Sequence, residues 1–143
     1  PGVTAGIAVP AYMGIPVTHR LAGSSVTFVT GHDGIDKRRP SVNWQALAQG
    51  SDGLVIYMGV HNLRYITDQL LIGGLDPSTP TIVIQQGTVV GQKSVKAPLS
   101  SLHEAVVKQG FNSPSIVLIG SSIKYQVESC SPDPADVTMP IPR

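Results

Sequence analysis

The chain has 143 residues and a formal net charge of +1, so it is long enough for a single core and has no general basic field that would favour nucleic acid or an anionic membrane. Its single cysteine, Cys130, excludes an internal disulfide and a cysteine-rich zinc site. The scattered histidines show no metal-ligand spacing, so the sequence predicts no metal ion.

Charged residues make up only 13% of the chain, about half of the value usual in soluble domains. So low a fraction indicates large buried surfaces, either a sheet covered on both faces or an interface with another domain or subunit. No apolar run reaches the roughly 18 residues of a membrane span, and no segment resembles a signal peptide. The composition therefore predicts a soluble, intracellular domain.

The first predicted element is a short helix over residues 5–13. Its residues are small or apolar all round, so as a helix it is expected to be buried on every side. Thr4 is the predicted N-cap, and Gly14 followed by Pro16 is a stop signal. Pro10 lies inside this helix, where it removes a backbone hydrogen bond and can introduce a kink.

Strands and helices then alternate along the chain. Segments that are apolar or rich in β-branched residues are predicted strands: 25–30, 54–58, 80–85, 92–95 and 115–120. Helices are predicted over 44–48, 63–72 and 101–110, the last beginning with a capping-box pattern of Ser101 and Glu104. Polar composition predicts a surface loop over 33–40 and a loosely attached, Pro-rich tail over 125–143. This order predicts an α/β layer domain whose sheet has about five strands flanked by helices.

Several predicted strands end at a glycine, namely Gly31, Gly59, Gly87 and Gly120. In open α/β sheets, ligands bind outside the carboxyl ends of the strands, where glycine lets the backbone approach a ligand. The alternative is that each glycine only ends its strand as a turn residue. No GxGxxG, P-loop or nucleophile-elbow motif is present, so a dinucleotide, P-loop or serine-hydrolase site has no support.

Arg20 is a candidate binding residue because it follows a Gly-Ile-Pro turn that restricts the backbone. A forked guanidinium held in this way suits a planar carboxylate. The alternative is an arginine that is simply exposed on the surface.

The motifs, taken in order, resemble a known family. PGVTAGIAVPAYMGIPVTHR, SSVTFVTGH, WQALA, LVIYMGV, TPTIVIQQGT and PSIVLIG strongly resemble the uroporphyrinogen-III C-methyltransferases, which belong to the tetrapyrrole methylases. The resemblance runs from Pro1 to about Gly120. It implies the C-terminal α/β domain of a two-domain enzyme, with a mixed sheet. It also implies a cytoplasmic (or plastid) homodimer that binds S-adenosylmethionine between its domains, releases S-adenosylhomocysteine, and methylates uroporphyrinogen III at C2 and C7 to give precorrin-2.

The resemblance also implies roles for individual residues. The residues expected to bind S-adenosylmethionine are Thr4, Ala5, Met58, Gly87 and Thr88. Arg20, in the THR motif, is expected to contact the acetate or propionate arms of the tetrapyrrole.

The family's first-domain loops and its residues for proton handling have no counterpart in this sequence. The chain is therefore expected to comprise a remnant of the first domain over 1–22, the second domain over 23–124 and the tail over 125–143. The catalytic residues are expected in the absent N-terminal part, and the isolated chain is expected to be inactive. Two alternatives stay open. One is another precorrin methyltransferase, and the other is a non-catalytic cofactor-binding or interaction module that uses the helix over 5–13 to contact a partner chain.

Overall fold

The computed structural model describes residues 1–32 and 42–127. The predicted loop over 33–40 lies outside the described residues, as do Cys130 and all of the predicted tail beyond residue 127.

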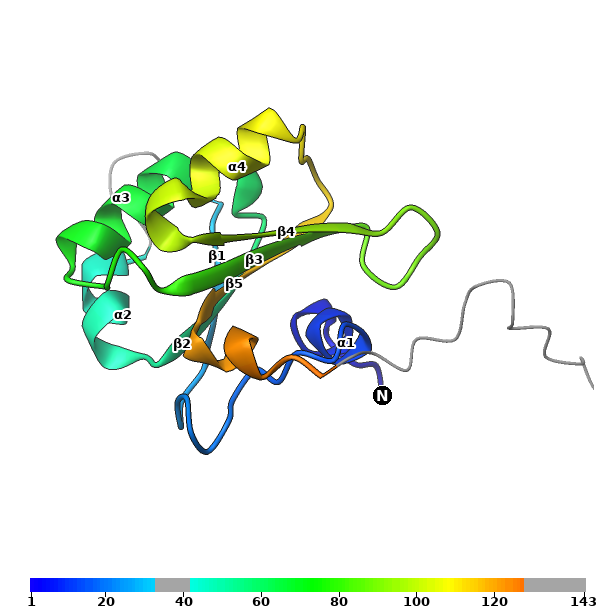
Figure 1. The fold of residues 1–143 in the computed structure, drawn as a ribbon, viewed down its shortest axis with the longest axis horizontal. Helices are drawn as coiled ribbons and strands as arrows, with labels where there is room; N and C mark the ends of the chain where they lie inside the picture. The colour runs from blue at the N-terminus through cyan, green and yellow to red at the C-terminus, as the bar shows by residue number, and fades with distance from the viewer. Residues whose placement is uncertain (33–41, 128–143) are drawn as a thin grey trace, which may run out of the picture.

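The core of the molecule is a five-stranded mixed sheet (Figure 1). Its strands are β1 (Thr27–Thr30), β2 (Gly53–Tyr57), β3 (Pro80–Gln85), β4 (Lys93–Pro98) and β5 (Ser115–Gly120). They lie in the order β1-β2-β5-β3-β4. β1 and β2 are parallel, whereas β5 is antiparallel to both β2 and β3, and β4 is antiparallel to β3. The predicted α/β fold with a mixed sheet of about five strands is therefore confirmed.

Helices cover both faces of the sheet. The α-helices are α1 (Ala5–Tyr12), α2 (Trp44–Gly50), α3 (Leu63–Ile72) and α4 (Leu102–Lys108). Short 3-10 helices are η1 (Val60–Asn62), η2 (Leu99–Ser101) and η3 (Ser121–Tyr125). In Figure 1, α1 lies on one side of the sheet, and α2, α3 and α4 lie on the other.

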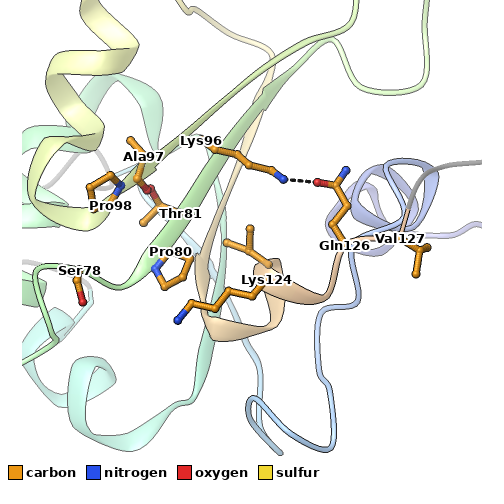
Figure 2. A pocket seen from close by; sticks show the side chains of 10 residues that line it. Ser78, Pro80, Thr81, Lys96, Ala97, Pro98, Lys124, Gln126 and Val127 are labelled. Carbon is orange, nitrogen blue, oxygen red and sulfur yellow. Dashed lines mark hydrogen bonds between the residues drawn. The ribbon is translucent and has the colours of Figure 1, made fainter.

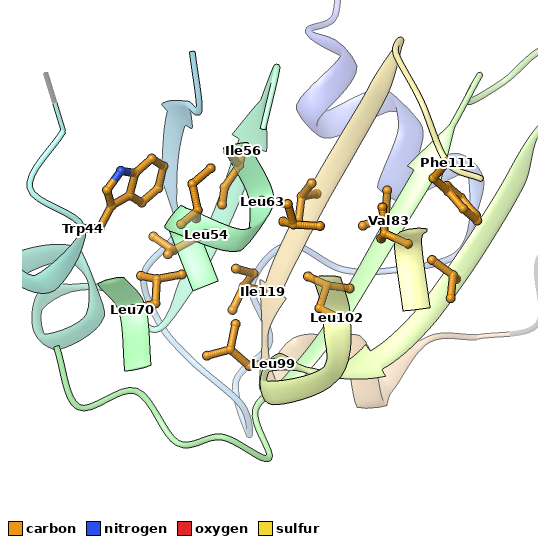
Figure 3. Close-up of a cluster of buried hydrophobic side chains, with 14 residues drawn as sticks. Trp44, Leu54, Ile56, Leu63, Leu70, Val83, Leu99, Leu102, Phe111 and Ile119 are labelled. Atoms are coloured by element: carbon orange, nitrogen blue, oxygen red, sulfur yellow. The ribbon is translucent and has the colours of Figure 1, made fainter. Parts of the chain in front are cut away.

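Alternate residues of the central strands point into two separate cores. Leu54 and Ile56 of β2 belong to the core under α2, α3 and α4, and Val55 between them belongs to the core under α1. Figure 3 shows the larger core, in which Trp44 of α2 and Leu102 of α4 pack over the sheet. Strands buried on both faces explain both the near-continuous apolar runs and the low charge content of the sequence.

Several predicted element ends differ from the structure, and three of the differences have identifiable reasons. β1 begins two residues later than predicted, because the amide of Ser25 donates to the carboxylate of Asp52 instead of joining the sheet. β4 extends to Pro98, beyond the predicted 92–95, because it pairs with the whole of β3. The capping box at Ser101 does not form, since the helical segment begins earlier as η2 and Ser101 makes no side-chain cap.

The prediction that the first helix is buried on every side is also wrong for the described residues. Gly6, Val9 and Pro10 are buried against the sheet, whereas Ala11 and Tyr12 are exposed. The sheet covers one side of an isolated helix, and no described segment covers the opposite side. α1 nevertheless continues for two residues beyond Pro10.

The packing of α1 on the sheet depends on a glycine. A Cβ atom added to Gly87, just after β3, would lie 2.5 Å from Cγ1 of Val9 in α1. Gly87 has no positive φ angle, so its role is to admit the helix and not to form a special turn. This geometry favours the structural interpretation of this strand-end glycine, without excluding a ligand beside it.

Substitution Gly87→Ala is expected to lower the free energy of unfolding by about 1–3 kcal/mol, because the new methyl group must displace Val9. Urea denaturation measures this change. Gly50→Ala is the matched control, since no atom lies within 4 Å of its added Cβ. The double variant Val9→Ala/Gly87→Ala should lose less unfolding free energy than the two single variants lose in sum. Losses that are strictly additive would contradict the proposed clash.

The entry into β1 is fixed by a hydrogen-bonded loop at Asp52. Its Oδ2 atom accepts hydrogen bonds from the Ser25 hydroxyl at 2.9 Å and from the amides of Ser24 and Ser25 at 2.9 and 3.0 Å. The Ser25 hydroxyl in turn accepts a bond from the Asp52 amide at 3.0 Å. These bonds, led by the Ser25 hydroxyl, hold the pKa of Asp52 below its ordinary value.

Because the pKa of Asp52 is lower in the folded than in the unfolded chain, its stabilising contribution is present above about pH 4 to 5 and is lost as the pH falls through the folded-state value. The difference in unfolding free energy between the wild type and Asp52→Asn should therefore narrow as the pH falls from 7 to 3. Ser25→Ala should weaken this pH dependence, since it removes the largest cause of the shift. A difference independent of pH would contradict the assignment.

Candidate functional site

A cavity of about 590 Å³ lies where the carboxyl ends of β2 and β3 meet the amino end of β5. These three ends share one edge of the sheet because β5 runs antiparallel to both of its neighbours. α1 forms one wall through Ala5 and Val9. The remaining lining residues are Tyr57, Met58, Ile84, Gln86, Gly87, Val89, Ser113, Pro114, Ser115 and Ile116.

The backbone at this edge is strained. Met58 and Gln86, which directly follow β2 and β3, adopt left-handed conformations with φ angles of +52° and +51°. Thr88 has a φ of +70°. Such conformations cost a non-glycine residue about 1–3 kcal/mol each, and they cluster at ligand sites, where the surrounding structure imposes them. The strain lies on the residue before each strand-end glycine, so the sequence gives no signal for it.

Tyr57 fixes the amino end of α1 over the cavity. Its hydroxyl shares a hydrogen bond of 2.5 Å with Thr4 Oγ1 and accepts one of 3.2 Å from the amide of Gly6. Any side chain at Gly6 would collide with the Tyr57 hydroxyl. Thr4 is the residue before the helix, as predicted, but it makes no side-chain cap, and its hydroxyl bonds to Tyr57 instead. Sequence reasoning missed Tyr57, whose only signal is a hydroxyl at the end of an apolar strand.

Some of the residues predicted to bind the cofactor line this cavity, and others do not. Ala5, Met58 and Gly87 line the cavity, and Met58 is 59% exposed. Thr4 adjoins it through Tyr57. Thr88 is not among the lining residues, and its amide donates to Gln92 Oε1 at 2.7 Å.

Arg20 does not join this group. It is exposed and follows His19, which lines a second cavity of about 430 Å³ together with Ile7 and Ala11. The His19 ring stacks on Tyr125 with a centroid distance of 3.9 Å. Residues 7 and 11 lie about 200° around the helix from residues 5 and 9, so the two cavities flank α1 on different sides.

A third cavity, of about 700 Å³, lies between the amino end of β3, the carboxyl end of β4 and η3 (Figure 2). Lys96 and Lys124 line it, and the Lys96 ammonium donates to Gln126 Oε1. Both lysines are exposed. None of the residues predicted from the sequence lies there.

The described residues show neither a metal-binding cluster nor a membrane-spanning helix. Within residues 1–32 and 42–127, no three His, Cys, Asp or Glu side chains gather in a way that could hold a metal ion. In the same part of the chain, no helix combines the length and apolar character needed to cross a bilayer.

Comparison with known proteins decides the family. Residues 1–103 match the family model described as Tetrapyrrole (Corrin/Porphyrin) Methylases. The chain belongs to the tetrapyrrole methylase family.

Relatives within this family are substantially similar to the chain. A uroporphyrinogen-III C-methyltransferase of Synechocystis is 47% identical over 125 residues, which cover 87% of this chain and 48% of that protein. An S-adenosyl-L-methionine-dependent uroporphyrinogen III methyltransferase of Methanosarcina barkeri is 38% identical over 123 residues, 86% of this chain and 48% of that protein. The chain thus spans about half the length of these curated relatives.

A solved structure of the same family agrees with the fold. It is a uroporphyrin-III C-methyl transferase from Thermus thermophilus complexed with S-adenyl homocysteine. The match has a TM-score of 0.69 and 26% identity, and it covers 87% of this chain and 52% of that one.

Within this tetrapyrrole methylase, replacing Tyr57 by phenylalanine should lower the unfolding free energy by about 0.5–1.5 kcal/mol, because the hydroxyl bonds to Thr4 and Gly6 are lost. Thr4→Val should cost less, since Gly6 keeps its acceptor. Hydrogen exchange at the Gly6 amide should accelerate in Tyr57→Phe and change little in Thr4→Val. Unchanged exchange at Gly6 in Tyr57→Phe would contradict the role assigned to the hydroxyl.

Proposed function

We propose that the chain supplies part of the cofactor and substrate cleft of an S-adenosylmethionine-dependent enzyme that methylates uroporphyrinogen III at C2 and C7 to give precorrin-2. The observation that carries the proposal is the cavity beside α1, on which Ala5, Met58 and Gly87 converge. The similarity to uroporphyrinogen-III C-methyltransferases over 87% of the chain supports the choice of reaction.

The cavity suits a nucleoside cofactor. Its volume of about 590 Å³ lies within the range of small-molecule pockets. Its walls are mainly apolar, as the face of an adenine base requires, and the Met58 side chain is exposed beside them. Thr4 and Thr88 stand next to the lining residues, and their hydroxyl groups would supply polar contacts to the ribose or amino-acid part of the cofactor. S-adenosylmethionine would bring a methyl group on a positively charged sulfur.

Substrate binding is proposed for Arg20. The eight carboxylates of uroporphyrinogen III need fixed cations, and an exposed guanidinium can bind a carboxylate through two hydrogen bonds. Arg20 lines neither this cavity nor the second one, although His19 beside it lines the second. Catalysis also needs the reacting carbon aligned with the methyl donor. We propose that residues outside these 143 supply the groups that align them, and that the whole protein is a cytoplasmic homodimer.

One observation favours a second candidate function. α1 has exposed apolar or small residues at Ala5, Ala11 and Tyr12, and the chain spans about half the length of its relatives. A non-catalytic module that binds the cofactor or a partner chain through exposed residues of α1 would have the same features. Methyl transfer distinguishes the two functions.

The reaction is tested by joining this chain to the half of the Synechocystis relative that it does not match. The chimaera is expected to transfer methyl groups from S-adenosylmethionine to uroporphyrinogen III, with NMR of the product locating them at C2 and C7. Methylation at other carbons would contradict the proposed product. A folded, cofactor-binding chimaera without turnover would favour the non-catalytic module.

In the same chimaera, Met58→Ala should weaken binding of S-adenosylhomocysteine about five- to tenfold, because the cavity loses an exposed apolar side chain. Isothermal titration calorimetry measures this change. Val107→Ala is the control, since Val107 is an exposed apolar residue of α4 on the other face of the sheet. Equal affinity of Met58→Ala and the wild type would remove Met58 from the site.

A further inference from the structure

The rim of the cavity beside α1 contains a hydrogen-bonded pair that joins two loops. Ser113, which lines the cavity, lies in the loop between α4 and β5. Its Oγ atom is 3.2 Å from Nε2 of His61 in η1, a residue 52 positions earlier in the chain. The pair thus spans the edge of the sheet between the end of β2 and the start of β5.

Both loops are held in place independently of this pair. The amide of Asn112 donates to Gln85 Oε1 at 2.6 Å, and the amide of Gln86 donates to the Pro114 carbonyl at 3.0 Å. On the other side, the Asn62 side chain donates to the Gly31 carbonyl at 2.7 Å. The hydroxyl of Ser113 is therefore presented to the cavity from a fixed backbone, as a binding residue requires.

The hydroxyl groups that line the cavity, on Tyr57, Ser113 and Ser115, all make hydrogen bonds within the chain. Tyr57 bonds to Thr4 and Gly6, and the Ser115 hydroxyl donates to the carbonyl of Asn112. Ser113 differs from Ser115 because it is exposed at the rim, whereas Ser115 is half-buried, and its partner is an imidazole. With the imidazole proton on Nδ1, Nε2 accepts the hydroxyl proton, and the lone pairs of Ser113 Oγ are left for a donor in the cavity.

We propose that Ser113, oriented by His61, is a specificity residue that accepts a hydrogen bond from the exocyclic amino group of an adenine nucleoside in this cavity. The inference rests on the proposed cofactor site and adds to it the selection of a 6-amino purine over a 6-oxo purine. Ser113 is the binding group, and His61 is a positioning residue that acts through it. The apolar walls bind the faces of the base, which adenine and hypoxanthine share, so they cannot make this distinction.

The test uses the chimaera with the Synechocystis half, labelled with ¹⁵N and titrated by NMR with S-adenosylhomocysteine and with its 6-oxo (inosine) analogue. The wild type should bind the amino form more tightly. Ser113→Ala should weaken binding of the amino form about three- to tenfold and abolish the preference, because one hydrogen bond is lost. Ser113→Thr keeps the hydroxyl and should keep the preference. Ser100→Ala, at an exposed serine of η2, is the matched control.

His61→Ala should also reduce the preference for the amino form over the 6-oxo form. The double variant His61→Ala/Ser113→Ala should bind the amino form no more weakly than Ser113→Ala alone. Unchanged affinity and preference in Ser113→Ala would overturn the inference and leave the cofactor site standing. Absence of any shift near Met58 and Gly87 on titrating the wild type would overturn the cofactor site, and the inference with it. Additive losses in the double variant would contradict the positioning role of His61.

Discussion

The contact between α1 and the carboxyl-terminal edge of the sheet is the interaction on which the site depends. Gly87 lets Val9 approach the end of β3, and the Tyr57 hydroxyl holds the residues at the start of the helix. These contacts have different physical natures, one steric and one polar, but they fix the same helix. Together these two contacts position the wall of the cavity that Ala5 and Val9 of α1 provide. The edge of the sheet that carries the proposed cofactor site is thus built by packing within the chain.

Backbone strain and packing are related at this edge. Met58 and Gln86 take up the left-handed turns, and so the following glycines are not needed for that purpose. Gly87 is free to admit α1 because the residue before it adopts the unfavourable conformation. The cores on the two faces of the sheet supply the stability that tolerates this cost, since the central strands bury side chains on both sides.

Sequence patterns predicted the sheet and most of its helices, because burial on both faces leaves continuous apolar runs in β2, β3 and β5. β4 is longer than predicted because it is an edge strand in which only Val95 is buried, so its apolar pattern is weak. The capping box failed because η2 begins the helical segment before Ser101. The length of β4 and the start of this helical segment depend on contacts with other segments, which no local sequence pattern encodes.

The residues of the candidate site that lie in motif loops could be predicted from the family resemblance. Contacts between residues far apart in the sequence could not. Ala5, Met58 and Gly87 were named from motifs, and they share one cavity. Tyr57 and the pair of His61 and Ser113 were not, because each depends on a contact between segments about 50 residues apart. The positive φ angle of Met58 is equally invisible in a sequence, since methionine has no special preference for that conformation.

α1 separates two cavities, and this arrangement has a mechanical consequence. Ala5 and Val9 face the cavity with the strained turns, whereas Ile7 and Ala11 face the cavity beside His19. A rigid helix cannot move toward one cavity without moving away from the other. The Tyr57 and Gly87 contacts therefore help to position α1 relative to both cavities, and a change at either contact would move the walls that α1 contributes to each.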